Sequence, residues 1–565
     1  MMNKAQLDLV FLWHMHQPDF RDHATGEYVQ PWVYLHAIKD YTDMAAHLEN
    51  HPGVKAVVNF TPVLLDQLED YADQFASGEL RDPLLRLLGH PDLYRIDAAD
   101  RDLVLSRCFK ANHHKMIEPY PTYRRLWDFF VLTQQPGSAG ESYLSAQYLG
   151  DLLTWYHLAW LGETVRRRDP IVPQLQTKAQ GFSHADRKQL LDLIGREVSA
   201  VIPRYRKLAE AGRIELTTTP GHHPIGPLLV AFESAREAEP SMTLPQSPQY
   251  PGGRNRAAAH IAEASRSHAA RFGAPPRGMW PAEGAISQPF VALLAEGGCG
   301  WIASGEGVLV NSLRKGDAAL PERAKYLYRP YRLSGGRATV TAFFRDDRLS
   351  DLIGFEYSKW HGKDATAHFI GELEAILEAN TEGVQQVVSV ILDGENAWEY
   401  YPYNGYYFLD ELYARLEAHP RIRTTTFAGC LDAGITATPL PSLVAGSWVY
   451  GNLATWIGAA DKNRAWDLLC AAKQGFDLVA ASGRLTAEEL ATATAQLADC
   501  EASDWFWWFG DYNPGDAVSQ FDHLFRLKLG HLYRLLKLPV PVELDVVVSR
   551  GGGAAELHGA MRRAS

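Results

Sequence analysis

Two acidic side chains stand directly after apolar segments of this chain. Glu283 lies in GMWPAEG, residues 278–284, and Asp393 ends VVSVILD, residues 387–393. Either acid alone fits a helix cap or a surface charge, but both share one setting, with a tryptophan nearby and few local cations. Paired carboxyl groups suit cleavage of a glycosidic bond. One attacks the anomeric carbon, while the other protonates the leaving oxygen and later activates water.

Histidines gather after two other apolar segments. His14 and His16 follow the first one, and His223 lies in TPGHHPIGPLL, residues 219–229. In a strand with a side-chain period of two, His14 and His16 point to the same side. A His-x-His pair suits a zinc or manganese site. No obvious third histidine and carboxylate complete such a site, so we favour a hydrogen-bonding pair in a polar pocket and expect no metal or cofactor.

Composition narrows the classes of partner. The net charge of −12 argues against nucleic acid, because phosphate binding needs clustered Lys and Arg. The chain has 15 Trp and 25 Tyr, which suit either sugar stacking or core packing. The apolar run near the N-terminus is too short for a signal peptide or a membrane span. The five cysteines are scattered without a CxxC pair, which favours reduced thiols in the cytoplasm.

The elements that must position these residues alternate along the chain. Helical patterns separate buried strands, which predicts a parallel sheet covered by helices, either open or barrel-like. Active sites of such folds lie at the carboxyl ends of the strands. The predicted strands cover residues 7–14, 54–60, 214–219, 276–280, 300–304, 339–344 and 386–393.

Three further regions complete the predicted organisation. We assign a catalytic domain to residues 1–435, with a mostly helical insertion at about 70–210 and a long Pro- and Gly-rich loop at 236–256. A helical C-terminal domain follows over residues 436–540, because the strand signal fades and long helical patterns replace it. Residues 541–565 form a tail.

Five segments, in this order, resemble the conserved regions of glycoside hydrolase family 57. They are WHMHQP, TPGHHPIGPLL, GMWPAEGAIS, VVSVILDGENAWEYY and GSWVYGNLATWIGAADKNRAWDLL. FFRDDRLSDLIGFEY and SDWFWWFGDYN resemble its α-amylase and amylopullulanase branch in particular. The resemblance extends over roughly residues 7 to 535.

The resemblance implies an incomplete barrel of seven βα units and a helical domain that closes one side of the cleft. It also implies a retaining glycosidase of α-glucans such as starch, glycogen and maltooligosaccharides, with Glu283 as nucleophile and Asp393 as acid/base. Retention would place the two carboxyl groups about 5–5.5 Å apart, with the pKa of Asp393 raised by burial and by the charge of Glu283. The expected substrate-binding residues are His14, His16, Gln17, His223, Trp280, Glu395, Trp398, Trp456 and Asp504.

One position departs from the family pattern. The segment WIASGEG, residues 301–307, has Gly305 where the family usually has Asp. If that Asp contributes to the site, substrate preference or rate would differ in this chain, whereas the core mechanism need not change.

Three alternatives remain open. A 4-α-glucanotransferase or branching enzyme would use the same covalent intermediate and pass the sugar to another sugar hydroxyl. A metal-dependent carbohydrate deacetylase would use His14 and His16 as ligands and lose activity with a chelator, but its paired Asp and HxxxH arrangement is not evident. A non-catalytic glucan-binding protein would have no need of the carboxylate pair. The sequence leaves linkage preference, endo or exo attack and oligomeric state undecided.

Overall fold

A computed structural model describes residues 6–134, 140–315, 319–336, 338–380 and 385–553. Its centre is a sheet with seven mutually parallel strands in the order β8-β1-β2-β3-β4-β5-β7. These strands are β1 (Leu7–Met15), β2 (Ala56–Phe60), β3 (Ile214–Thr218), β4 (Gly278–Met279), β5 (Trp301–Ser304), β7 (Ala338–Phe344) and β8 (Gln386–Asp393). Each falls at a segment predicted as a strand, and the incomplete barrel is confirmed.

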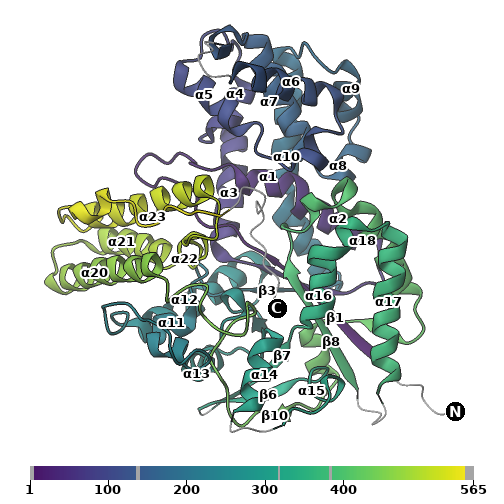
Figure 1. The fold of residues 1–565 in the computed structure, drawn as a ribbon, viewed down its shortest axis with the longest axis vertical. Coiled ribbons are helices and arrows are strands. Elements are labelled where there is room, and N and C mark those ends of the chain that lie inside the picture. The colour runs from purple at the N-terminus through teal and green to yellow at the C-terminus, as the bar shows by residue number, and fades with distance from the viewer. Residues whose placement is uncertain (1–5, 135–139, 316–318, 337, 381–384, 554–565) are drawn as a thin grey trace.

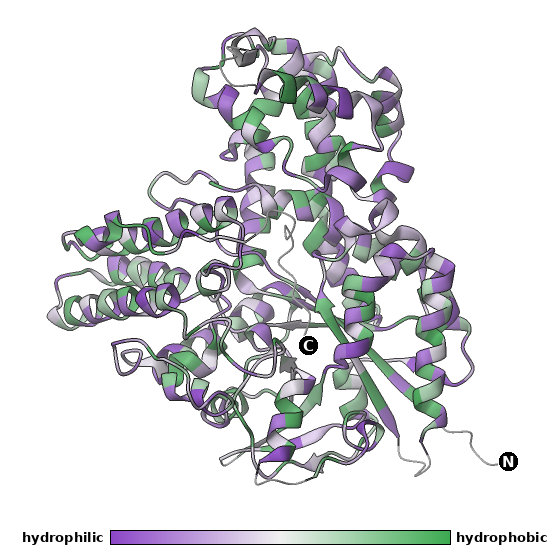
Figure 2. Ribbon diagram, viewed as in Figure 1, coloured by the Kyte–Doolittle hydropathy of each residue, from purple (hydrophilic) through white to green (hydrophobic). Residues whose placement is uncertain are grey.

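The central strands form because they are apolar on both faces. Every residue of β1 is buried, and β8 is buried up to its last residue, Asp393. This is the pattern of a parallel sheet that helices cover on both sides. Figure 2 shows hydrophobic residues along β1 and β8, whereas the surrounding helices carry both hydrophobic and hydrophilic residues. The covering helices include α3 (Pro62–Ser77), α12 (Gly253–Phe272), α13 (Gln288–Glu296), α14 (Glu306–Arg314), α17 (Gly362–Glu378) and α18 (Tyr406–Ala418).

Three short strands extend the sheet beyond the predicted ones. β6 (Tyr331–Gly335) runs antiparallel to β7, β10 (Thr438–Pro439) pairs with β6, and β9 (Ile422–Thr424) pairs with β1. β6 alternates between buried and exposed residues, as an edge strand with one solvated face does. The sequence prediction missed these strands because it was based on continuous apolar runs.

A layer of helices stands on one end of the sheet, at the top of Figure 1. It comprises α4 (Pro83–Gly89), α5 (Ala98–Arg107), α6 (Pro121–Thr133), α7 (Ala146–Trp160), α8 (Glu163–Arg168), α9 (Ile171–Lys178) and α10 (His184–Glu210). Nearly all of α7 is buried, because α4, α5, α6 and α10 pack around it. α10 also packs against α3 and so ties this layer to the barrel. These helices lie within residues 83–210, and their assignment as an insertion at about 70–210 stays a prediction.

The chain after the sheet is helical. α20 (Ala460–Ser482), α21 (Ala487–Cys500), α22 (Asp504–Trp508) and α23 (Gly515–Leu535) pack together beside the barrel. A capping box between Thr486 and Glu489 starts α21. Residues 541–553 pack back onto these helices, with Ser549 Oγ donating to Asp461, and the rest of the predicted tail lies outside the described residues. The exact domain boundaries stay a prediction. No helix in the described ranges has the length and apolarity needed to cross a membrane.

Candidate active site

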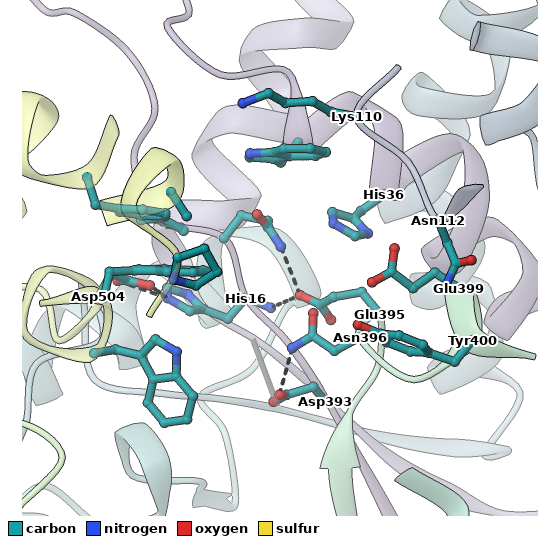
Figure 3. A pocket seen from close by; sticks show the side chains of 18 of the residues that line it. His16, His36, Lys110, Asn112, Asp393, Glu395, Asn396, Glu399, Tyr400 and Asp504 are labelled. Atoms are coloured by element: carbon teal, nitrogen blue, oxygen red, sulfur yellow. Dashed lines mark hydrogen bonds and ion pairs between the residues drawn. The ribbon is translucent and has the colours of Figure 1, made fainter. Parts of the chain in front are cut away.

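A cavity of about 720 Å³ lies at the carboxyl ends of the strands. Three parts of the chain enclose it: the strand ends, the helical insertion and the C-terminal helices. Five of the nine predicted substrate-binding residues line this cavity together with both members of the carboxyl pair, and Figure 3 labels several of them. Those that line the cavity are Glu283, Asp393, His14, His16, Gln17, Glu395 and Asp504.

Glu283 sits on a sharp turn directly after β4. Its backbone is left-handed, with φ 59° and ψ 21°, a conformation that costs a non-glycine residue about 1–3 kcal/mol. Gly284 is left-handed as well. The Ser304 hydroxyl, at the end of β5, donates to the Gly284 carbonyl oxygen over 2.6 Å. This hydrogen bond from β5 stabilises the strained turn, and the turn directs the Glu283 side chain into the cavity.

Trp448, from the segment before the C-terminal helices, contacts Glu283 twice. Its indole Nε1 donates to Glu283 Oε2 over 2.8 Å, and its backbone N–H donates to the Glu283 carbonyl oxygen over 3.0 Å. A hydrogen bond donated to a carboxylate stabilises its charged form, which is the form a nucleophile needs.

Gly305 makes room for this contact. A Cβ atom at Gly305 would lie 2.4 Å from Trp448 Cα and 3.2 Å from the Ser447 carbonyl oxygen. Those are backbone atoms, so a side chain at position 305 requires the segment around Trp448 to shift. Gly305, where the family usually has Asp, therefore packs directly against Trp448, the residue that donates a hydrogen bond to Glu283.

Asp393 ends β8 and is followed by a tight turn. The Gly394 backbone N–H donates to the His14 carbonyl oxygen over 2.7 Å, and a Cβ at Gly394 would lie only 2.1 Å from Met15 Sδ. Burial raises the pKa of Asp393 to about 6, although the Asn396 hydrogen bond and nearby His16 act in the opposite direction. Asn396 Nδ2 donates to Asp393 Oδ2 over 2.8 Å. The expected upward shift is present, and burial is its main cause.

Glu395 joins the first and last central strands. Its Oε1 accepts the His16 backbone N–H at 3.1 Å, Gln17 Nε2 at 3.3 Å and the Tyr41 hydroxyl at 3.2 Å. Burial, and then the neighbouring Asp393, raise the pKa of Glu395 well above its usual value. The three hydrogen bonds to its Oε1 tie Glu395 to the loop that carries His16 and Gln17.

The three predicted histidines are in contact with one another. His14 Nε2 and His223 Nε2 lie 3.1 Å apart, so one ring donates and the other accepts. The rings of His16 and His223 stack with centroids 3.9 Å apart. Burial, and then His16, lower the pKa of His14 to about 3, and the same causes lower the pKa of His223. Both buried rings are neutral, and His223 lies behind His16, outside the cavity lining.

The C-terminal helices complete the histidine cluster. Asp504, the first residue of α22, lies 3.0 Å from His16 Nε2, and Ser503 Oγ lies 2.8 Å from His223 Nδ1. His16, His223 and Asp504 bring one possible metal-ligand atom each to within 4.8 Å of one another. The nitrogens of His16 and His223 are engaged in hydrogen bonds with protein partners, so the surrounding protein fixes the orientation of both rings.

Three predicted tryptophan contacts lie outside the cavity lining. Trp280 is fully buried and packs edge-on against Trp448, with ring centroids 5.3 Å apart. Trp398 Nε1 donates to the Gly394 carbonyl oxygen over 2.8 Å and supports the Asp393 turn from below. Trp456 is fully buried near Trp507. Packing is the role that the geometry assigns to these rings, and their direct contact with a substrate stays a prediction.

Three residues that shape the site were not predicted from the sequence: Trp448, Asn396 and Arg345. Trp448 lies in the fifth family-like segment, from which Trp456 was chosen instead. Arg345 lies in FFRDDRLSD, and its guanidinium donates to the Ile391 carbonyl oxygen over 2.8 Å and lies 5.4 Å from the Trp448 ring centroid. An arginine followed by two aspartates at a predicted strand end was the available signal.

Comparison with known proteins agrees with this architecture. A branching enzyme from Thermococcus kodakaraensis aligns over 95% of this chain and 93% of its own, with 17% identity and a TM-score of 0.57. The α-amylase AmyC from Thermotoga maritima aligns over 94% and 93%, with 13% identity and a TM-score of 0.55. The 4-alpha-glucanotransferase from Thermococcus litoralis aligns over 94% and 60%, with 14% identity and a TM-score of 0.52. These similarities show that the proteins share a fold with this chain.

The sequence itself gives the family. No curated protein matches the chain, but the profile of glycosyl hydrolase family 57 matches residues 10–432. That range contains six of the seven parallel strands, β1 from residue 10 onward, and both proposed catalytic carboxyl groups. The chain belongs to glycosyl hydrolase family 57.

Proposed function

We propose that this glycoside hydrolase cleaves α-glucosidic bonds of α-glucans with retention of configuration, using Glu283 as nucleophile and Asp393 as acid/base. One observation carries the proposal. Two carboxyl groups line one cavity in opposite settings: Glu283 accepts a hydrogen bond that favours its anion, whereas burial raises the pKa of Asp393 to about 6. Carboxyl groups with divergent environments mark the acid and the nucleophile of a glycosidase.

The proposed reaction has two steps. Glu283 attacks the anomeric carbon while Asp393 gives its proton to the leaving glycosidic oxygen, so the C–O bond breaks and a glycosyl ester forms on Glu283. The Asp393 carboxylate then takes a proton from water, whose oxygen displaces Glu283 and restores the free enzyme. His14 and His16 line the cavity beside the carboxyl pair and would contact the bound sugar.

The main competing proposal is that the glycosyl group on Glu283 passes to an acceptor other than water. A sugar hydroxyl in place of water would make the enzyme a glucanotransferase or a branching enzyme, the activities named for two of the similar structures. The cavity offers aromatic surface for such an acceptor, because Trp508 and Phe521 line it and stack with centroids 4.7 Å apart. Stacking on aromatic faces suits sugar rings as well as it suits protein packing.

We also propose that the substrate is a storage glucan such as glycogen or starch and that the enzyme works in the cytoplasm. The cysteines support a reducing compartment, since all five are free thiols and buried. Fractionation of the native cells, followed by detection of the protein, tests the location independently of the chemistry.

Glu283→Gln tests the reaction. The amide cannot attack carbon, so turnover of maltooligosaccharides should fall below about one-thousandth of the native rate, while glucan binding persists. Substantial residual turnover would disprove the assignment. Parallel digests of amylose, pullulan and glycogen with the native enzyme then separate the acceptors: new reducing ends indicate hydrolysis, whereas longer or branched products indicate transfer.

A further inference from the structure

A second polar cluster lies in the same cavity, away from the histidines. Figure 3 shows His36, Asn112, Glu399 and Tyr400 gathered on the side of the cavity opposite Asp504. His36 ends α1 (Trp32–His36), Asn112 precedes η2 (His113–Ile117) of the helical insertion, and Glu399 lies in η8 (Trp398–Tyr400). η2 and η8 pack against each other, so the insertion completes this cluster.

The polar atoms of the cluster are held so that some remain available to a ligand. His36 Nδ1 lies 2.7 Å from Asp40 Oδ2, and Lys39 Nζ donates to Asp40 Oδ1 over 2.7 Å. With Nδ1 engaged, Nε2 is the nitrogen that the His36 ring can offer to a ligand. Asn112 Oδ1 accepts the Lys115 backbone N–H at 3.1 Å, which leaves the Nδ2 amide group as a donor.

Glu399 contributes a carboxyl group that the proposed mechanism does not use. Burial raises its pKa to about 7, with Asp40 acting in the same direction and Lys39 in the opposite one. A carboxyl group that is protonated for much of the time both donates and accepts hydrogen bonds. Sugar hydroxyls also both donate and accept hydrogen bonds, so the Glu399 carboxyl group can pair with them.

Aromatic rings stand directly beside these polar groups. Trp32 and Trp160 line the cavity with ring centroids 5.8 Å apart, and their centroids lie 6.4 and 5.6 Å from that of His36. A pocket with apolar ring faces and a few convergent polar atoms is the usual form of a small-molecule site. Aromatic faces beside hydroxyl partners are the chemistry that recognises a pyranose ring.

We propose that His36, Asn112 and Glu399 bind a glucosyl unit of the substrate at a distance from the bond that is cleaved. This remote subsite rests on the proposed function, because its ligand is part of the same α-glucan chain. Its walls come from α1, from the helical insertion and from η8, so it gives the insertion a role in selecting longer glucans. Binding energy gained there is available to both hydrolysis and transfer.

The test measures affinity in the Glu283→Gln background, where turnover does not interfere. Calorimetric titration with maltotriose and maltoheptaose gives the gain in affinity for the longer chain. Glu399→Leu should reduce that gain by about five- to tenfold, as the loss of hydrogen bonds to a ligand does. Glu399→Gln keeps a neutral group that donates and accepts, and should change the gain by less than about twofold. His36→Ala should act like Glu399→Leu, and it replaces that variant if Glu399→Leu does not fold.

Exposed Glu378 on α17 provides the matched control, and Glu378→Leu should leave both affinities unchanged. If maltoheptaose binds the Glu283→Gln variant and neither Glu399→Leu nor His36→Ala reduces the gain, the remote subsite is disproved and the proposed function stands. If neither oligosaccharide binds the Glu283→Gln variant, the α-glucan function itself fails, and the subsite fails with it.

Discussion

Glu283 and Asp393 both stand at the ends of parallel strands, yet the chain holds them by different means. The Asp393 turn is local: Gly394 allows the close approach to Met15, and Asn396 donates to the carboxylate only three residues along the chain. The Glu283 turn depends on distant partners. Its backbone is left-handed, and its side-chain donor is Trp448, 165 residues later.

This difference separates the two chemical tasks. Burial alone raises the pKa of an acid, so Asp393 needs only its strand end and the surrounding packing. A nucleophile at the same edge of the sheet must remain charged, and the Trp448 indole supplies a donor to Glu283 from a distant part of the chain. Changes in the segment before the C-terminal helices should therefore affect the nucleophile, whereas changes within residues 393–396 should affect the acid.

The largest effect should come from the acid. Asp393→Ala removes the proton donor, so turnover of maltooligosaccharides should fall about 1,000-fold or more. An aryl glucoside with a good leaving group needs no protonation and should still form the glycosyl ester, and added azide should release it as a glucosyl azide of retained configuration. Glu283→Gln serves as the control, because any azide that reacts there must attack the sugar directly and would give a glucosyl azide of inverted configuration. Equal loss on both substrates without azide rescue would contradict the assignment of Asp393.

The next effect concerns the distant donor. Trp448→Phe keeps an aromatic ring and removes one hydrogen bond to a charged group, which is worth about 1.5–3 kcal/mol, or roughly a 10- to 100-fold loss in kcat. Trp448→His retains a ring N–H and should lose less. Steady-state kinetics on maltoheptaose checks both, with KM changing less than kcat. An equal loss in the two variants would mean that the ring packs the site without positioning Glu283.

A smaller effect should follow at Gly305. Gly305→Ala places a methyl group against the Trp448 backbone, and overpacking of this kind costs about 1–3 kcal/mol. The melting temperature should fall, and kcat should fall with it because Trp448 is displaced. Gly371→Ala on α17 is the matched control, since a Cβ there meets nothing within 4 Å. An unchanged melting temperature for Gly305→Ala would show that the two segments are not tightly packed.

The same contrast explains what the sequence alone could predict. Segments predicted as strands cover all seven parallel strands, although β3 (IELTT) and β4 (Gly278–Met279) are not themselves continuous apolar runs. Asp393 was found at the end of the clearest run. β6, β9 and β10 were missed because they are short or only half-buried. Glu283 was found from its apolar neighbours and its family-like segment, but nothing near it in the chain indicates Trp448.

The tryptophans show most clearly which site contacts cannot be predicted from the sequence alone. Trp280 and Trp456 were selected from the resemblance to the family and Trp398 as a neighbour of Asp393, and all three are buried outside the cavity lining. Trp448 and Trp508 line it. A tryptophan that packs under a turn and one that faces a ligand have the same neighbours in sequence. Only the tertiary arrangement, which depends on the insertion and the C-terminal helices, separates them.

The smallest effect should be a shift in the pH profile. Asp393 acts in its protonated form, so kcat/KM should fall as the pH rises above its pKa of about 6. The Asn396 hydrogen bond stabilises the Asp393 carboxylate and lowers that pKa. Asn396→Ala should therefore raise the pKa and move the alkaline limb of the profile to higher pH. Asn255→Ala, at an exposed position of α12, should leave the limb in place. A limb that stays fixed or moves to lower pH in Asn396→Ala would mean that a group other than Asp393 supplies the proton.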